Sequence, residues 1–192
     1  MKIGITLTSS LQVAQEYIDL TEKIANKLAD AGHSIVYGGT SYGMMLTLAD
    51  AYLKSGGKEL IGITSEDLIA VTKGYQLHPR LSTKHIVKSI SERKDKILAE
   101  SDAMLILPGG YGTVEELITI ISGQVNKLIN KPIAIYNHNN FYDTLIGFLT
   151  ELQEKKFTKI KPEEVVYVST NIDQILEYFT SYRPRFLVDK FV

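Results

Sequence analysis

Short apolar runs and longer stretches of helical periodicity alternate along the whole chain. Several of the runs are continuously apolar, as parallel strands that are buried on both faces usually are. This alternation predicts a parallel sheet covered by helices. Seven strands are predicted, at Lys2 to Thr8, Ser34 to Tyr37, Leu60 to Thr64, Lys84 to Val87, Ala103 to Leu107, Ile133 to Tyr136 and Val165 to Val168. The expected fold class is α/β: a Rossmann-like three-layer sandwich whose mostly parallel sheet of about seven strands is flanked by helices.

Helical periodicity fills most of the segments between these strands. After the first strand, Ile18, Ile24 and Leu28 recur at helical spacing, and Gly32 stands where a left-handed residue ends a helix. Further helices are predicted at Gly43 to Ser55, Ser91 to Glu100, Thr113 to Asn126, Tyr142 to Lys155 and Ile172 to Tyr182. The stretch from Ser65 to Ser82 has the weakest pattern, so we expect an irregular connection or a short helix there.

The length and the overall composition are those of one soluble domain. The chain has 192 residues, of which 44% are hydrophobic and 22% charged, and no apolar run approaches the ~20 residues of a membrane span. We therefore expect a single Rossmann-like domain over residues 1–192. The last residues, 183–192, are apolar enough to form a docking tail, on the same domain or on a second subunit. The first residues run directly into a strand pattern without a secretory signal, which favours a cytoplasmic protein.

Cysteine content and charge narrow the range of possible ligands. The chain has no cysteine, and its four histidines are not paired at ligand spacing, so we expect neither a disulfide nor a bound metal. The formal net charge of -1 argues against binding to nucleic acid or to a membrane surface. A small molecule is the expected ligand.

A glycine-rich loop follows the fifth predicted strand. The strand stops at Pro108, and the chain turns through three glycines within four positions before a helix begins. Glycine permits positive φ and close backbone approach, and the free amides of a helix start attract anions. The sequence therefore predicts a phosphate-binding loop. Its residues are Gly109, Gly110, Tyr111, Gly112 and Thr113.

A structural interpretation of the same segment stays open. Thr113 and Glu116 also fit a capping box, in which the two side chains satisfy helix-start amides and bind no ligand. Three glycines are more than such a cap needs, and the adjacent carboxylates Glu115 and Glu116 suit a site better than a plain helix start. The spacing therefore favours a functional loop.

A second candidate lies on the helix that precedes this strand. Ile90, Arg93 and Ile97 are spaced so that they share one helix face, which would turn Arg93 inward. A buried guanidinium requires a partner, because an unpaired charge away from water is costly. The alternative is a solvated helix on which Arg93 extends its charged end into water.

Two further loops at strand ends could line the same cleft. The segment from Tyr37 to Met45 is again a strand end, a glycine-rich turn and a helix, with Gly39 and Gly43 as candidate ligand contacts. The first strand ends in hydroxyl residues, of which Ser9 is the candidate for binding a base or a sugar. Each signal is weak alone, since tight turns use glycine and helix caps use serine for structural reasons.

Together these residues resemble the Lonely Guy family of cytokinin riboside 5'-monophosphate phosphoribohydrolases, whose members are often labelled lysine decarboxylases. The family pattern Pro-Gly-Gly-x-Gly-Thr-x-x-Glu is matched without a gap from Pro108 to Glu116, and the family's Arg-Lys pair is matched by Arg93-Lys94. The resemblance covers residues 1 to 180. It implies a homodimer, or a larger homo-oligomer, that needs no cofactor.

The resemblance also implies roles for individual residues. Arg93 and Glu116 would be the catalytic pair. The phosphate would be held by Gly110, Gly112 and Thr113, and Lys94 and Glu115 would contact the substrate. Ser122 keeps the hydroxyl of a threonine that the family commonly carries on the helix after the loop.

The expected reaction is hydrolysis of the N-glycosidic bond of a nucleoside 5'-monophosphate, AMP or an N6-modified AMP, to the free base and ribose 5-phosphate. The chain has Ile90-Ser91 where the family often has Met-His, which leaves the preferred base open. The main alternative is a non-catalytic nucleotide or molybdenum cofactor carrier on the same fold. A pyridoxal phosphate decarboxylase would need a Schiff-base lysine in a larger framework. A dehydrogenase would carry its glycine fingerprint after the first strand, where Thr8-Ser9-Ser10 stands.

Overall fold

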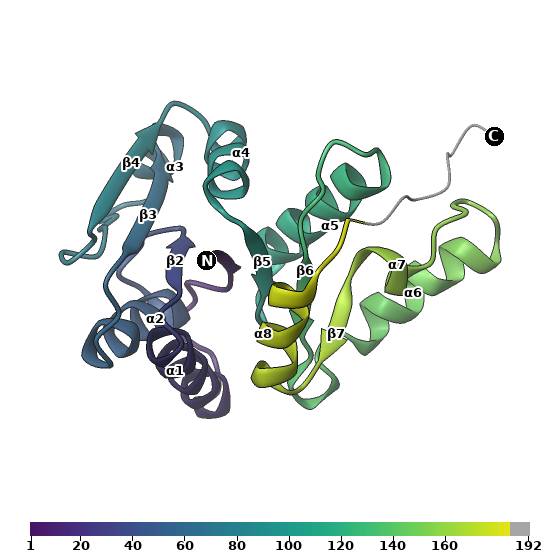
Figure 1. Ribbon diagram of the computed structural model, residues 1–192. Coiled ribbons are helices and arrows are strands. Elements are labelled where there is room, and N and C mark those ends of the chain that lie inside the picture. Colours follow the sequence, from purple (N-terminus) through teal and green to yellow (C-terminus); the bar gives the residue numbers. More distant parts are fainter. Residues whose placement is uncertain (185–192) are drawn as a thin grey trace. The chain divides into compact units, whose positions relative to one another are not determined.

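Strands and helices alternate through the computed structural model, which describes residues 1–184 (Figure 1). The strands are β1 (Lys2–Thr6), β2 (Ser34–Tyr37), β3 (Leu60–Ser65), β4 (Thr83–Val87), β5 (Ala103–Ile106), β6 (Ile133–Tyr136) and β7 (Tyr167–Ser169). The α-helices are α1 (Gln15–Asp30), α2 (Gly43–Lys54), α3 (Glu66–Val71), α4 (Ile90–Glu100), α5 (Tyr111–Val125), α6 (Asp143–Glu154), α7 (Pro162–Val165) and α8 (Ile172–Ser181). A 3-10 helix, η1 (His138–Asn140), precedes α6. The predicted α/β class is therefore confirmed.

The strands form a sheet with the order β4-β3-β2-β1-β5-β6-β7. The pairs β1 with β2, β2 with β3, β3 with β4, and β6 with β7 are parallel. A crossover helix joins each strand to the next, as parallel pairing requires. The mostly parallel, helix-flanked sheet of about seven strands agrees with the prediction.

The chain divides into two compact units. The first, Met1–Met104, contains β1 to β4 and the helices α1 to α4. Its central strands are buried throughout, with Ile3, Ile35 and Ile63 fully inaccessible, because helices cover the sheet and leave no strand face in water. Helices α1 and α2 pack against each other, and α4 packs on β3.

The second unit, Leu105–Val192, carries β6, β7 and the helices α5 to α8. Its core includes Ile133, Ile135 and Ile175, with α8 packed on β6 and β7. Helices α6 and α7 contact each other, and α7 also contacts α5. The prediction of one domain over residues 1–192 stays a prediction. The predicted docking tail falls mainly on residues 185–192, which lie outside the described residues.

Most predicted element limits agree with the structure to within two residues. Helix α1 ends where Gly32 adopts a left-handed conformation with φ of 70°. The weakly patterned stretch from Ser65 to Ser82 contains the short helix α3, as expected, and the Ser65 side chain accepts a hydrogen bond from the Leu68 amide at its start. No helix in residues 1–184 combines the length and the apolar character that crossing a membrane requires.

The last strand begins later than predicted. The strand was expected from Val165 to Val168, but Val165 ends helix α7 and β7 begins at Tyr167. Pro162 at the first helical position, together with the Glu164 carboxylate that accepts the Lys161 amide at 2.9 Å, starts a helical turn in this segment. The apolar Val165-Val166 pair therefore resembles strand sequence without starting a strand.

Candidate functional site

Helix α5 begins earlier than predicted and has no side-chain cap. Gly110 takes the N-cap position with extended backbone angles, so Tyr111 is the first helical residue and Thr113 the third. No side chain hydrogen-bonds to the first turn, and this turn carries no acidic residue. The capping box of Thr113 and Glu116 is therefore wrong, because Thr113 lies inside the helix rather than at its N-cap.

The first amides of α5 are arranged in a way that suits the binding of an anion. The first hydrogen bond within the helix runs from the Val114 amide to the Gly110 carbonyl at 3.0 Å. The amides of Tyr111, Gly112 and Thr113 precede it, and such amides have no partner within a helix. Tyr111 is 97% exposed, so this end of the helix faces solvent. The helix dipole adds positive potential at the same place.

The three loop glycines serve two different purposes. A Cβ on Gly109 would lie 2.2 Å from Oγ1 of the buried Thr113, so packing inside the loop requires glycine there. A Cβ on Gly110 or on Gly112 would meet nothing within 4 Å, and neither residue has positive φ. Neither backbone strain nor contacts in the described part of the chain thus explain these two glycines. Glycine at both positions would allow a ligand to approach the backbone closely, and that ligand contact stays a prediction.

The two adjacent carboxylates follow within the second turn of α5. Glu115 is exposed and accepts a hydrogen bond from Oγ1 of Thr119 at 3.3 Å. Glu116 is half-buried. Because residues four apart share a helix face, Glu116 stands one turn along the helix from the exposed Gly112. The Glu116 carboxylate thus lies on the same helix face as Gly112, whose amide is one of the three that precede the first helical hydrogen bond.

Arg93 is buried in the first unit. Only 7% of the residue is exposed, and its Nε donates a hydrogen bond to the Ile63 carbonyl at 2.9 Å. The inward orientation predicted from the helix face is confirmed, and the alternative of an arginine extended into water is wrong. The buried face of α4 is narrower than predicted, however, because Ile90, which was expected to share it, is 38% exposed. Lys94, the neighbour of Arg93, is half-buried.

Gly38 makes room for this guanidinium. A Cβ at Gly38 would lie 2.2 Å from Nη2 of Arg93, so the arginine end packs directly on the backbone just after β2. The guanidinium thus lies at the carboxyl ends of β2 and β3, where open parallel sheets bind ligands. Gly38 was not among the predicted site residues. Its only signal in the sequence is the Gly38-Gly39 doublet.

Packing alone explains glycine at the other two predicted positions of the first unit. Gly39 is buried with φ of 75°, and its Cβ would lie 2.9 Å from the Cα of Gly62. Gly43 has φ of 52°, and its Cβ would lie 2.2 Å from the Ser10 carbonyl oxygen. This contact brings the start of α2 against the loop after β1, in which Ser9 is exposed. Ligand contacts of Ser9, Gly39 and Gly43 stay predictions.

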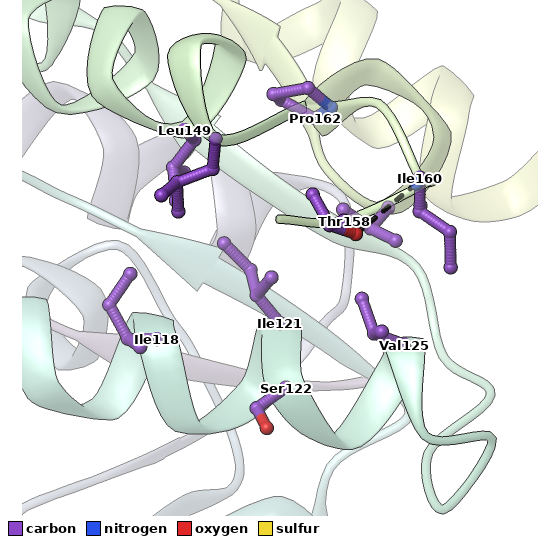
Figure 2. Close-up of a pocket in the computed structure, with 10 residues that line it drawn as sticks. Ile118, Ile121, Ser122, Val125, Leu149, Thr158, Ile160 and Pro162 are labelled. Atoms are coloured by element: carbon purple, nitrogen blue, oxygen red, sulfur yellow. Dashed lines mark hydrogen bonds between the residues drawn. The ribbon is translucent and has the colours of Figure 1, made fainter. Parts of the chain in front are cut away.

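An apolar pocket of about 290 Å³ lies elsewhere in the second unit (Figure 2). It is formed by α5, α6, α7 and the loop between the latter two, and its lining includes Ile118, Ile121, Val125 and Leu149. Ser122 also lines this pocket. It stands eleven residues after Tyr111, about 16 Å along the helix axis from the glycine loop at 1.5 Å per residue. Its contact with substrate stays a prediction.

Arg93 belongs to the first unit and Glu116 to the second. Within residues 1–184, no group of three or more histidine, aspartate or glutamate side chains could hold a metal ion.

These features define an α/β protein with a glycine-rich loop and an uncapped helix start after strand β5. A family model described as "Possible lysine decarboxylase" matches residues 45–179. A cytokinin riboside 5'-monophosphate phosphoribohydrolase from Rhodococcoides fascians is 31% identical over 158 residues, which cover 82% of this chain and 78% of the relative. The chain belongs to this family, that of the Lonely Guy phosphoribohydrolases.

Other relatives and solved structures agree with this assignment. A probable cytokinin riboside 5'-monophosphate phosphoribohydrolase from Oryza sativa subsp. japonica is 27% identical over 190 residues, covering 96% of this chain and 72% of the relative. Among solved structures, the molybdenum cofactor binding protein from Rippkaea orientalis matches with a TM-score of 0.69 and 17% identity, over 94% of this chain and 95% of that chain. At this identity the structural match shows a shared fold.

Proposed function

We propose that this protein hydrolyses the N-glycosidic bond of a nucleoside 5'-monophosphate, AMP or an N6-modified AMP, to the free base and ribose 5-phosphate. The observation that carries the proposal is the uncapped start of α5, where three successive amides precede the first helical hydrogen bond, in a family of phosphoribohydrolases. A phosphate is the group that such a helix start binds best. The names of the relatives supply the substrate class.

The carboxylate of Glu116 is the proposed catalytic group. Breaking the bond between C1' and the base nitrogen develops positive charge on the ribose ring, and a nearby carboxylate stabilises that charge or accepts a proton from the attacking water. The water oxygen forms the new bond to C1', and the base leaves with a proton on the nitrogen that was bonded to the sugar. Gly110, Gly112 and Thr113 hold the phosphate, with the first amides of α5 as the hydrogen-bond donors, and Glu115 and Lys94 contact the substrate.

Arg93 serves this reaction by holding charge in place. A guanidinium stays protonated and makes a poor proton donor, so its role is to position the substrate and to balance negative charge on the phosphate or on the departing base. Its side chain is already ordered by the Ile63 carbonyl and by the Gly38 backbone. A charged side chain that is already held in place loses little conformational freedom when the substrate binds.

The test is base release from a matched substrate set. The protein is incubated with AMP, with isopentenyl-AMP and with adenosine, and the free base is separated and quantified by chromatography. We expect base from both monophosphates, and at least about a hundredfold lower kcat/KM for adenosine, because loss of the phosphate removes several charge-assisted hydrogen bonds.

Two results would contradict the proposal in different ways. Equal cleavage of adenosine and AMP would show that phosphate binding by the α5 amides does not contribute to the reaction. Binding of AMP without any release of base would indicate a carrier instead of a hydrolase. The ratio of kcat/KM for AMP to kcat/KM for isopentenyl-AMP then shows which base is preferred.

We further propose that the protein is a homodimer and that the apolar pocket face of the second unit forms the contact between copies. Phe148 of α6 and Phe157 of the loop after it are 54% and 80% exposed, so the elements that form the pocket also carry exposed apolar side chains. Surfaces of this kind mark protein contacts. Sedimentation velocity of the wild-type chain tests this: an Ile121→Asp variant should sediment as a monomer, and an unchanged dimer would place the contact elsewhere.

The proposed location is the cytoplasm. Nucleoside 5'-monophosphates carry a doubly charged phosphate, which does not cross a bilayer unaided. An enzyme that acts on them is expected in the compartment where they are made.

A further inference from the structure

A buried tyrosine of the second unit contacts the backbone of the glycine loop. Tyr142 directly precedes α6 and is 1% exposed. Its hydroxyl donates a hydrogen bond to the Leu107 carbonyl at 2.8 Å, and the Gly109 amide lies close to the hydroxyl oxygen. The tyrosine thus contacts the backbone beside Pro108, at the point where the chain leaves β5 for the loop.

The turn at Pro108 depends on such a contact. Proline has no amide proton, so this position cannot donate a hydrogen bond to the backbone around it. The buried groups of the turn therefore need a side-chain partner, and the Tyr142 hydroxyl supplies one to the Leu107 carbonyl. Burial raises the pKa of Tyr142 above its usual value, which keeps the phenol protonated and able to donate.

Tyr142 is itself held from the end of β6. The Asn137 side chain accepts a hydrogen bond from the Tyr142 amide at 2.8 Å and donates one to the Asp143 carboxylate at 2.7 Å. The Asn137 amide in turn donates to the Ser169 carbonyl, just at the end of β7, at 3.0 Å. The position of the hydroxyl is therefore set by the sheet and not by the loop that it contacts.

We propose that Tyr142 is a positioning residue for phosphate binding. By holding the Leu107 carbonyl just before Pro108 it sets the path of the loop, and so the direction in which the amides of Tyr111, Gly112 and Thr113 are presented. The inference rests on the proposed function for its ligand, whereas the contact with the loop is a property of the fold. Tyr142 is 1% exposed, so its proposed effect on phosphate binding acts through the loop backbone.

The chain contains a matched control in Tyr52 of the first unit. Tyr52 is also 1% exposed, and its hydroxyl also contacts backbone groups: it donates to the His33 carbonyl at 2.8 Å and accepts from the Glu59 amide at 3.3 Å. These partners lie just before β2 and β3, at the amino ends of those strands. Tyr52→Phe therefore removes backbone hydrogen bonds of the same kind at a place where no ligand is expected.

The experiment compares Tyr142→Phe with Tyr52→Phe in the full chain. For each variant we measure kcat and KM with AMP, inhibition by ribose 5-phosphate and by free adenine, and the thermal midpoint of unfolding. Tyr142→Phe should raise the KM for AMP and the inhibition constant of ribose 5-phosphate about tenfold, with inhibition by adenine changed less than twofold. Both variants should lower the thermal midpoint of unfolding by similar amounts. Tyr52→Phe should leave the KM and the two inhibition constants within about twofold of the wild-type values.

Hydrogen exchange provides a readout that needs no activity. Peptides that cover residues 105–116 should exchange faster in Tyr142→Phe and at the wild-type rate in Tyr52→Phe. Equal kinetic constants in the two variants, or unchanged exchange in these peptides, would overturn the positioning role. If the wild-type chain cleaves no monophosphate, the proposed function fails, and the exchange rates together with ribose 5-phosphate binding still decide the role of Tyr142.

Discussion

Replacing Glu116 with glutamine is expected to lower kcat for base release from AMP by at least about a thousandfold while KM changes less than about threefold. Glutamine keeps the size of the side chain and removes its charge, so the variant loses transition-state stabilisation and retains phosphate binding through the backbone amides. Rates are measured in single-turnover reactions by chromatography of the released base. The half-burial of Glu116 leaves room for the amide without a large loss of stability.

Glu115→Gln is the matched control for that prediction. The two glutamates are adjacent on α5, but Glu115 is exposed and pairs with Oγ1 of Thr119. Its replacement should change kcat less than about tenfold, because a solvated carboxylate stabilises a developing charge far less than a desolvated one. If Glu116→Gln keeps more than a tenth of the wild-type kcat, or if the two variants lose equal activity, Glu116 is not the catalytic carboxylate.

Replacing Gly43 with alanine should strongly destabilise the first unit. The residue has φ of 52°, and the new Cβ would lie 2.2 Å from the Ser10 carbonyl oxygen, which is a backbone atom and not a movable side chain. The left-handed conformation costs about 1 kcal/mol for alanine, and separating α2 from the loop after β1 adds to it. We expect a total of at least about 3 kcal/mol, or a thermal midpoint lower by roughly 8 °C.

Gly32→Ala separates the two contributions. Gly32 is also left-handed, with φ of 70°, but a Cβ there meets nothing within 4 Å. This variant should therefore lose only the conformational part, about 1 kcal/mol, with the midpoint lowered by about 3 °C. Differential scanning calorimetry of both variants against the wild type measures the difference. Equal losses would mean that the approach of α2 to Ser10 tolerates a methyl group.

Periodicity was sufficient for the strands and for most helix limits. Continuous apolar runs such as Ile133 to Tyr136 admit a buried strand and little else, and the predicted and observed limits of that strand coincide. The inward face of α4 could also be read from spacing, since Arg93 and Ile97 are its two buried residues. What spacing could not supply was the arginine's partner, because the Ile63 carbonyl lies thirty residues away along the chain.

Local signals were misleading where two elements compete for the same residues. Thr113 and Glu116 have the spacing of a capping box. However, Gly110 takes the N-cap position, so the helix begins at Tyr111, two residues before Thr113, and Thr113 is buried against Gly109. The apolar pair at Val165 resembles a strand, although Pro162 begins a helical turn there. In both cases a neighbouring residue, Gly110 at the N-cap or Pro162 in the first turn, decides where the helix begins.

The sequence by itself determined the α/β class, the position of the glycine loop at a strand end and the family to which its motif belongs, because these depend on periodicity and on residue types at fixed spacing. Only the tertiary structure decided why Gly39, Gly43 and Gly109 are required, that Gly38 accommodates Arg93, and that Tyr142 contacts the turn at Pro108. Such contacts join residues far apart in the chain. Their energy depends on distances of a few ångströms, and these distances exist only after the strands have paired.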